Sequence, residues 1–302
     1  MAQTNNFSGL TEYVGARKDE LLVKASVEAK SLNYFDLYLG CKGGREIIPA
    51  LDNTVVLADG SACGWNPDGS DIISEIALDV NPAEVEKEFC QRDFEKTWAN
   101  YQLRWEAGRE TLPFEEAFIN GNIAATQEQL EKDIWSSGTT TYGMTGITGL
   151  LSAVSGDTTN VDFSGKTIVE KVDAMVAAMP ADAYKYGYER KVNLFMSETD
   201  FNAYVAAMNA ACCGKIGIID ANTEELAYIG NSKVVIVPTP GLEGLGKMVL
   251  APARSLAYGT DIEDSQSTVD FWFDRKDAKF LLRILFMAGV AVKLPKYTVV
   301  GA

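Results

Sequence analysis

The chain has 302 residues, a formal net charge of −15 at pH 7 and no histidine. The missing imidazole excludes a Ser-His-Asp triad, a Cys-His dyad, a histidine general base and a His-ligated zinc. The negative charge repels phosphate backbones, and a hydrophobic content of 47% is typical of a packed globular protein rather than a disordered one.

The first 80 residues predict a helical segment followed by a long hairpin. Residues 21–27 combine apolar and charged side chains in the way expected of a helix exposed on one side. From residue 41 the composition changes to Gly, Asp, Asn and Pro between short β-type segments, and the Pro-Asp-Gly at 67–69 is a turn signature. Residues 71–79 alternate as the return strand of this hairpin.

Charge is distributed unevenly between this hairpin and the C-terminal region. No Lys or Arg occurs between Glu46 and Glu86. The acidic residues in the stretch include Asp52, Asp59, Asp68, Asp71 and Glu75. Positive charge reappears late in the chain, at Arg275, Lys276, Lys279 and Arg283. We interpret the hairpin as an acidic arm that lies over a basic neighbour, the alternative being a solvated loop.

A long helix is predicted over residues 112–135. Its apolar positions are spaced by seven and four residues, which places them on one stripe. They are Leu112, Ile119, Ile123, Leu130 and Ile134. Acidic residues in the first turn suit the helix dipole, and Ser-Ser-Gly at 136–138 ends the pattern. At 1.5 Å per residue the helix would be roughly 35 Å long, enough to span a domain.

The second half of the chain predicts an α/β segment followed by a β-hairpin. A helix is expected from Ile168 to Met179, and another begins at Ser197 with Asp200 as its capping partner. Strands are expected at 192–196, 234–237 and 248–250. The final hairpin pairs 269–273 with 280–292 and turns at 274–277.

No motif in the sequence assembles a catalytic centre, and we predict no enzyme, cofactor or metal site. Ser-Gly-Lys-Thr at 164–167 is similar to part of a phosphate-binding loop, but Asn160 occupies a position that must be glycine. The five cysteines lack a C-x-x-C spacing and are expected to be free thiols. The N-terminus has no signal-peptide pattern, and the apolar run 280–292 is too short to span a membrane.

The order of these elements resembles the major capsid protein of tailed bacteriophages, which has the Hong Kong 97 (Johnson) fold. The long helix lies in TLPFEEAFINGNIAATQEQLEKDIWSSG, which is similar to the spine helix of that family. The segment VNLFMSETDFNAYVAAM is similar to a strand-helix unit of its axial domain. GNSKVVIVPTPGLEGLGKMVLAPARSLAYGTDIE and VDFWFDRKDAKFLLRILFMAGVAVKL resemble the segments that return to its peripheral domain.

The resemblance implies an α+β fold with an N-terminal arm, an extended β-hairpin loop, a peripheral domain with a spine helix and an α/β axial domain. The expected boundaries are 1–42 for the arm and 43–80 for the extended loop. The peripheral domain is expected at 81–149 and 252–290, and the axial domain at 150–251 and 291–302. The spine helix within the peripheral domain corresponds to 112–135.

The resemblance also implies a structural role in the virion. Hexamers and pentamers would assemble in the host cytoplasm into an icosahedral shell that encloses double-stranded DNA without reading its sequence. Portal, separate scaffolding and decoration proteins are the implied partners, with no membrane involved. The alternatives are an encapsulin-like nanocompartment shell or a soluble α/β enzyme.

Some capsid proteins of this family form Lys–Asn isopeptide crosslinks from a lysine in the extended loop. This sequence has no lysine between Gly43 and Glu86. We therefore predict a shell without such crosslinks.

Overall fold

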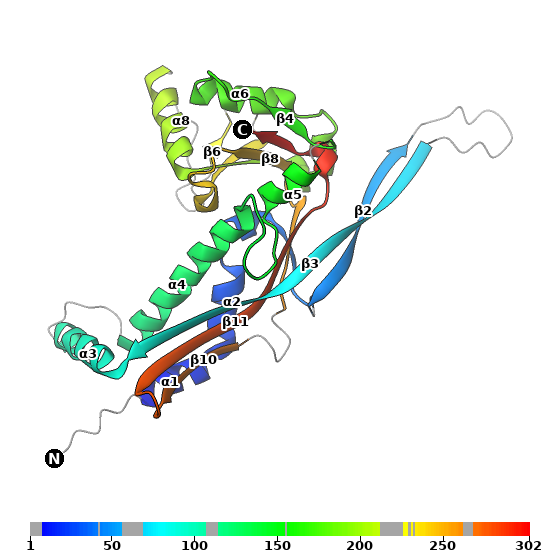
Figure 1. Ribbon diagram of the computed structural model, residues 1–302. Coiled ribbons are helices and arrows are strands. Elements are labelled where there is room, and N and C mark those ends of the chain that lie inside the picture. Colours follow the sequence, from blue (N-terminus) through cyan, green and yellow to red (C-terminus); the bar gives the residue numbers. More distant parts are fainter. Residues whose placement is uncertain are drawn as a thin grey trace, which may run out of the picture.

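The fold is built on two six-stranded sheets, seen in a computed structural model. The structure describes residues 8–41, 43–55, 69–106, 114–154, 156–211, 226–228, 231, 233–261 and 268–302. A long hairpin extends from the first sheet and projects away from the rest of the molecule (Figure 1). Within the described residues, no helix is both long enough and apolar enough to cross a membrane.

The first sheet has the strand order β1-β9-β11-β3-β2. β10 also pairs with β11, on the side opposite β3. The strands of this sheet are β1 (Asp36–Tyr38), β2 (Gly44–Val55), β3 (Gly69–Cys90), β9 (Leu256–Gly259), β10 (Thr268–Asp274) and β11 (Lys279–Val292). In β11 every second side chain from Phe280 to Phe286 is buried, because alternate residues of a strand face opposite sides. The predicted C-terminal hairpin is confirmed, and its strands pair from Thr268–Leu285 to Asp274–Lys279.

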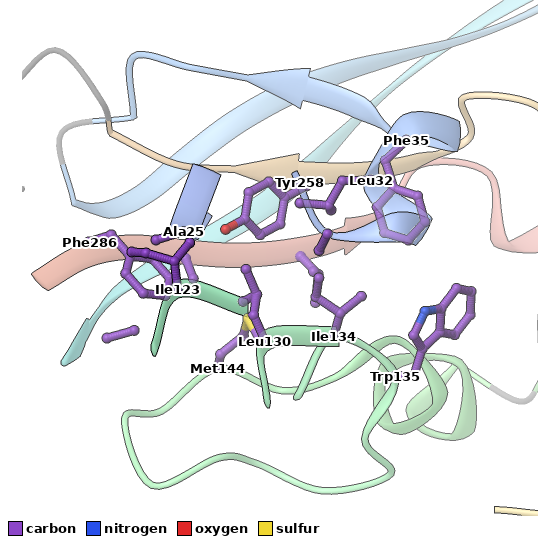
Figure 2. Packing of buried hydrophobic residues seen from close by; sticks show 14 of the residues in the cluster. Ala25, Leu32, Phe35, Ile123, Leu130, Ile134, Trp135, Met144, Tyr258 and Phe286 are labelled. Atoms are coloured by element: carbon purple, nitrogen blue, oxygen red, sulfur yellow. The ribbon is translucent and has the colours of Figure 1, made fainter. Parts of the chain in front are cut away.

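Three helices, α1 (Ser8–Ala16), α2 (Lys18–Val27) and α4 (Phe114–Trp135), pack on one face of this sheet. The predicted stripe of the long helix is confirmed in its described part, because Ile119, Ile123, Leu130 and Ile134 are all buried. Leu112 lies outside the described residues. Figure 2 shows the core between α4 and the sheet. Its labelled residues are Ala25, Leu32, Phe35, Ile123, Leu130, Ile134, Trp135, Met144, Tyr258 and Phe286.

The N-terminal segment, expected to be an arm, is folded against the chain's own core in its described part. Leu21 and Leu22 of α2 are buried, and the Tyr258 hydroxyl donates to the carbonyl of Ser26 at 2.9 Å. After α2, the short helix η1 (Lys30–Tyr34) places the Ser31 hydroxyl 3.1 Å from the donating Trp135 Nε1. Residues 8–41 therefore help to hold the long helix in place.

The second sheet has the order β4-β12-β8-β5-β7-β6. Its strands are β4 (Thr159–Val161), β5 (Val192–Met196), β6 (Leu226–Ala227), β7 (Val234–Pro238), β8 (Met248–Pro252) and β12 (Val299–Gly301). The helices α6 (Ile168–Ala178) and α8 (Glu198–Ala211) share a hydrophobic cluster with one side of this sheet. The predicted helices and strands of this region are confirmed, and the Asp200 N–H donates to the Ser197 hydroxyl at 3.1 Å. We call residues 156–254 and 293–302 the axial lobe.

The two sheets meet where α4 ends, around the buried carboxylate of Glu131. Its Oε2 accepts from the Ser31 N–H at 3.3 Å, whereas Oε1 has no hydrogen-bond partner. Burial raises the pKa of this carboxyl above its ordinary value. The short helix η3 (Pro240–Leu242) lies on α4 so closely that a Cβ at Gly241 would stand 2.2 Å from the Glu131 carbonyl oxygen. Only glycine fits at this contact.

Several elements were not predicted from the sequence. The helix α3 (Gln91–Glu106) precedes the long helix, and α5 (Ile147–Ala153) and α7 (Ala183–Tyr186) are short. The return strand of the first hairpin continues past the expected end at Asp79 to Cys90. In this extension, Ala83 and Val85 point inward and alternate with glutamates that point outward. Pro82 hides this strand pattern in the sequence, because proline is uncommon inside a strand.

Candidate interaction surfaces

The β2–β3 hairpin projects from the body of the molecule (Figure 1). Its strands form twelve residue pairs, from Gly44–Val80 at the base to Val55–Gly69 farther out. Among the side chains that the structure describes, a small cluster of buried residues anchors the base of the hairpin to the body. Its members are Cys41, Ile48, Leu78, Val80, Ala257 and Ala291. Next to this base, the side chain of Ile47 is 59% exposed.

The predicted acidic residues lie along this hairpin where the structure describes them. Asp52 pairs with Ile72 across the strands, and Asp71 pairs with Asn53 one position farther out. Glu75 is exposed. Asp59 and Asp68 lie outside the described residues. The described candidates therefore share one projecting element.

The predicted basic residues lie on the other hairpin, β10–β11. Arg275 and Lys276 are exposed in its turn. Lys279 pairs with Glu88 of β3 at 2.8 Å, and this hydrogen bond raises the pKa of the Lys279 ammonium. Arg283 forms an ion pair with Glu84 of the same strand. The structure thus brings the basic candidates together, with Lys279 and Arg283 already contacting carboxylates of their own chain.

Sequence reasoning missed a hollow on the outer face of this sheet. The hollow has a volume of about 350 Å³ and lies where Trp272 of β10 stands beside β11 and β3. Its lining residues are Glu86, Lys87, Glu88, Trp272, Leu281, Leu282 and Arg283. The sequence indicates only that Trp272 lies on the outer face, because Asp270 and Trp272 alternate with Val269 and Phe271, which are buried.

The motif at 164–167 is a helix cap in the structure. The Thr167 hydroxyl accepts from the Glu170 N–H at 3.4 Å, and the Glu170 carboxylate accepts from the Thr167 N–H at 2.8 Å. Both residues are therefore used to begin α6. Among the described residues, no group of three or more Cys, Asp and Glu side chains could hold a metal ion.

Two of the five cysteines lie in the described residues, and both are free thiols as predicted. Cys41 is buried and Cys90 is exposed. Burial raises the pKa of the Cys41 thiol to about 12. Cys63, Cys212 and Cys213 lie outside the described residues.

The fold is similar to that of solved shell proteins, although no protein-family model and no curated protein matches the sequence. A chain of the satellite phage P4 procapsid, a particle that includes the size determination (Sid) protein, has a TM-score of 0.62 at 10% identity. It matches over 100% of this chain and 97% of its own length. The chain has the Hong Kong 97 capsid fold.

Two further solved structures are similar to this chain. The capsid of a native GTA particle has a TM-score of 0.56 at 11% identity, covering 90% of this chain and 89% of its own. A virus-like particle from Pyrococcus furiosus has a TM-score of 0.53 at 9% identity, covering 99% of this chain and 100% of its own. The β2–β3 hairpin lies largely within residues 43–80, where the extended loop is predicted, and α4 lies within residues 112–135, where the spine helix is predicted.

Proposed function

We propose that the chain is the major capsid protein of a tailed bacteriophage. Copies would assemble as hexamers and pentamers into an icosahedral shell around double-stranded DNA, and the chain would catalyse no reaction. The capsid fold supports this proposal, since its likeness to the P4 procapsid chain extends over nearly the full length of both chains. Portal, scaffolding and decoration proteins would complete the virion.

The observation that carries the proposal is the projecting hairpin. An isolated two-stranded hairpin is at best marginally stable in water, and β2 contacts little besides β3 within the described part of the chain. A neighbouring molecule would cover the backbone edges of this hairpin and the exposed side chain of Ile47. A second copy of the chain supplies that cover in a shell.

The receptor that we propose for the acidic hairpin is the β10–β11 turn of a neighbouring copy. Arg275 and Lys276 are exposed there, next to Lys279 and Arg283 on the same hairpin. Opposite charges would guide the docking and fix its register. Replacing both turn residues in the variant Arg275→Glu/Lys276→Glu should weaken assembly, and unchanged assembly would assign the hairpin another receptor.

Electron microscopy and light scattering of the purified protein test the proposal. We expect rings or megadalton shells, and particles from infected cells should hold nuclease-protected DNA. A monomer that persists at high protein concentration and in crowding salts would contradict the proposal. Boiling in detergent should release single chains, because the described hairpin and the intervening sequence contain no lysine for an isopeptide bond.

A second candidate function is the shell of an encapsulin-like protein compartment. The likeness to a virus-like particle from the cellular organism Pyrococcus furiosus favours it, because that chain is matched along its whole length. The contents of native particles separate the two candidates. Packaged DNA and one portal vertex would identify a phage shell, whereas an enclosed enzyme in a small closed shell would identify a compartment.

A further inference from the structure

A cavity of about 390 Å³ lies between α4 and the first sheet. Strand β3 and α4 supply two of its walls, and residues 139–142 of the loop after α4 supply a third. Small-molecule sites in proteins usually have volumes of about 300–1,000 Å³. The cavity is therefore large enough to hold a small organic molecule.

Part of the cavity lining is apolar. Ala83 and Val85 of β3, Leu130 of α4 and Phe286 of β11 form this part. Figure 2 labels Leu130 and Phe286, which belong to the helix and the sheet on either side of the cavity. Ala83, Leu130 and Phe286 are buried, so a hydrocarbon group that reached them would leave water.

Another part of the lining carries the carboxylate of Asp133, which is partly buried. Its Oδ2 accepts from the Tyr142 hydroxyl at 3.1 Å, and its Oδ1 accepts from the Gln129 amide at 2.9 Å. Both donors are neutral, and a carboxylate has about four lone-pair sites for hydrogen bonds. Asp133 can therefore accept further hydrogen bonds from a ligand.

Among the described residues, no Lys or Arg forms an ion pair with Asp133. The charged side chains of α4 and β3 in this region have other partners. They are Lys132, which binds Glu128, Glu131, which accepts from Ser31, Lys87, which donates to Asn122, and Glu84, which binds Arg283. Burial raises the pKa of the Asp133 carboxyl, because partial removal from water disfavours its charged form. A positively charged ligand would stabilise that form.

The loop wall of the cavity is held in place by its own hydrogen bonds. The Thr140 N–H donates to the Met144 carbonyl at 2.7 Å, and the Met144 N–H donates to the Thr140 hydroxyl at 3.0 Å. The hydroxyls of Thr139 and Thr145 are hydrogen-bonded at 3.0 Å. A preformed site loses less entropy when a ligand binds, so affinity increases.

We propose that this cavity binds an organic cation, an ammonium or guanidinium group carried on an apolar stem. The cation would donate to the Asp133 carboxylate, and the stem would contact Leu130 and Phe286. Hydrogen bonds between a carboxylate and a cation are charge-assisted and stronger than neutral ones. The site is independent of the proposed function, because all of its parts lie within one chain.

A metal ion fits this lining less well than an organic cation does. Ca²⁺ takes about six to eight oxygen ligands, with several carboxylates among them. Of the two carboxylates among the described lining residues, that of Glu84 is already paired with Arg283. A metal ion would also make no use of the apolar part. An organic cation uses both parts of the lining.

Titration of the unassembled chain with phenethylammonium tests the site. Isothermal titration calorimetry should show saturable binding, and saturation-transfer NMR should show contact with the aromatic ring of the probe. Phenethyl alcohol has the same carbon skeleton without the charge. It should bind about tenfold more weakly or worse, because a hydrogen bond to a charged group contributes more than a neutral one.

Three variants assign the binding to the cavity. Asp133→Asn should weaken phenethylammonium binding about tenfold or more and leave phenethyl alcohol unaffected, since the amide oxygen can still accept from Tyr142. Ala83→Leu should weaken both probes by narrowing the cavity without changing its charge. Glu128→Gln is the matched control, because it removes one exposed carboxylate of α4 outside the lining and should bind normally. Circular dichroism checks that each variant is folded.

Assembled particles distinguish two sources of the cation. If the ligand is a free small molecule, particles should bind phenethylammonium as the unassembled chain does. If it is a Lys or Arg side chain of a second copy, assembly should fill the cavity and exclude the probe. In that case Asp133→Asn should also need a higher protein concentration to assemble.

Equal affinity for the two probes, or unchanged phenethylammonium binding by Asp133→Asn, would overturn the inference. An equal loss of binding in Glu128→Gln would overturn it too, because the effect would then belong to surface charge in general. So would the absence of saturable binding at up to about 10 mM phenethylammonium. These results come from the unassembled chain, whereas failure of the proposed function would appear as an absence of particles.

Discussion

One strand, β3, passes through two contrasting environments. Residues 81–90 form ten pairs with β11, and their inward side chains face the helix-covered core. In residues 69–80 the strand pairs with β2, and the hairpin that they form stands away from the body (Figure 1). The first environment is complete within one chain, and we propose that a second copy completes the other.

The contrast separates what the single chain needs for folding from what the proposed assembly would need. Buried apolar side chains stabilise the inner half by about 25 cal/mol for each Å² removed from water. The outer half has this protection at its base, around Ile48 and Leu78. Substitutions in the two halves should therefore change different measurements.

Removing the outer hairpin should have the largest effect. Pro49 and Glu75 are paired across the strands, so residues 50–74 can be replaced by a two-residue Asn-Gly turn that keeps the base intact. We expect a folded monomer with nearly unchanged thermal unfolding and no particles in electron microscopy. An unfolded product, or shells of normal size, would contradict the separation between a folding half and an assembly half of β3.

Ile284→Ala tests the inner half. Ile284 of β11 is fully buried opposite Val85, and removing a buried isoleucine side chain costs about 2–5 kcal/mol through lost burial and the cavity left behind. The loss should appear in urea unfolding of the unassembled protein. A loss below about 0.5 kcal/mol would show that the inner half is not the stabilising region.

Glu131→Gln tests how pH acts on the interior. Burial raises the folded-state pKa of Glu131, so its contribution to stability is complete below its unfolded pKa, near 4.5, and is lost as pH rises through the folded value. The glutamine variant cannot titrate at this position. Its stability relative to wild type should therefore increase as pH rises from about 4.5, and a pH-independent difference between the two proteins would contradict the assignment.

Ile47→Ala should have the smallest effect on the folded monomer. It repeats the Ile284 substitution at an exposed position of the hairpin, where changes are usually within about 0.5 kcal/mol. Assembly should nevertheless require more protein, because the side chain would contact a neighbour. Equal losses of monomer stability for the two substitutions would remove the distinction between the halves.

The sequence predicted the strongly periodic parts of the fold. The stripe on α4, the capped start of α8 and the β10–β11 hairpin each combine a clear hydrophobic period with a terminal signal. The short strands β1, β4 and β9 were not predicted, because three or four residues are too few to show a period. Their positions depend on partners distant in the chain, as β1 does on Ala257 to Gly259.

The candidate surfaces were predicted less completely. The acidic stretch is continuous in the sequence and was visible there, as was the positive C-terminal region. The grouping of Lys191, Lys233 and Arg254 was not, because these residues flank three strands, β5, β7 and β8, that align only in the folded sheet. Sequence order alone does not show which loop ends share an edge.

The continuity of β3 has a mechanical consequence. A neighbour that held the hairpin would pull on the strand along its length, and the tension would pass directly into the ten pairs that join β3 to β11. Strands pulled past each other resist in shear, with all their hydrogen bonds loaded together. A shell linked in this way would transmit internal pressure between subunits through backbone rather than through side chains.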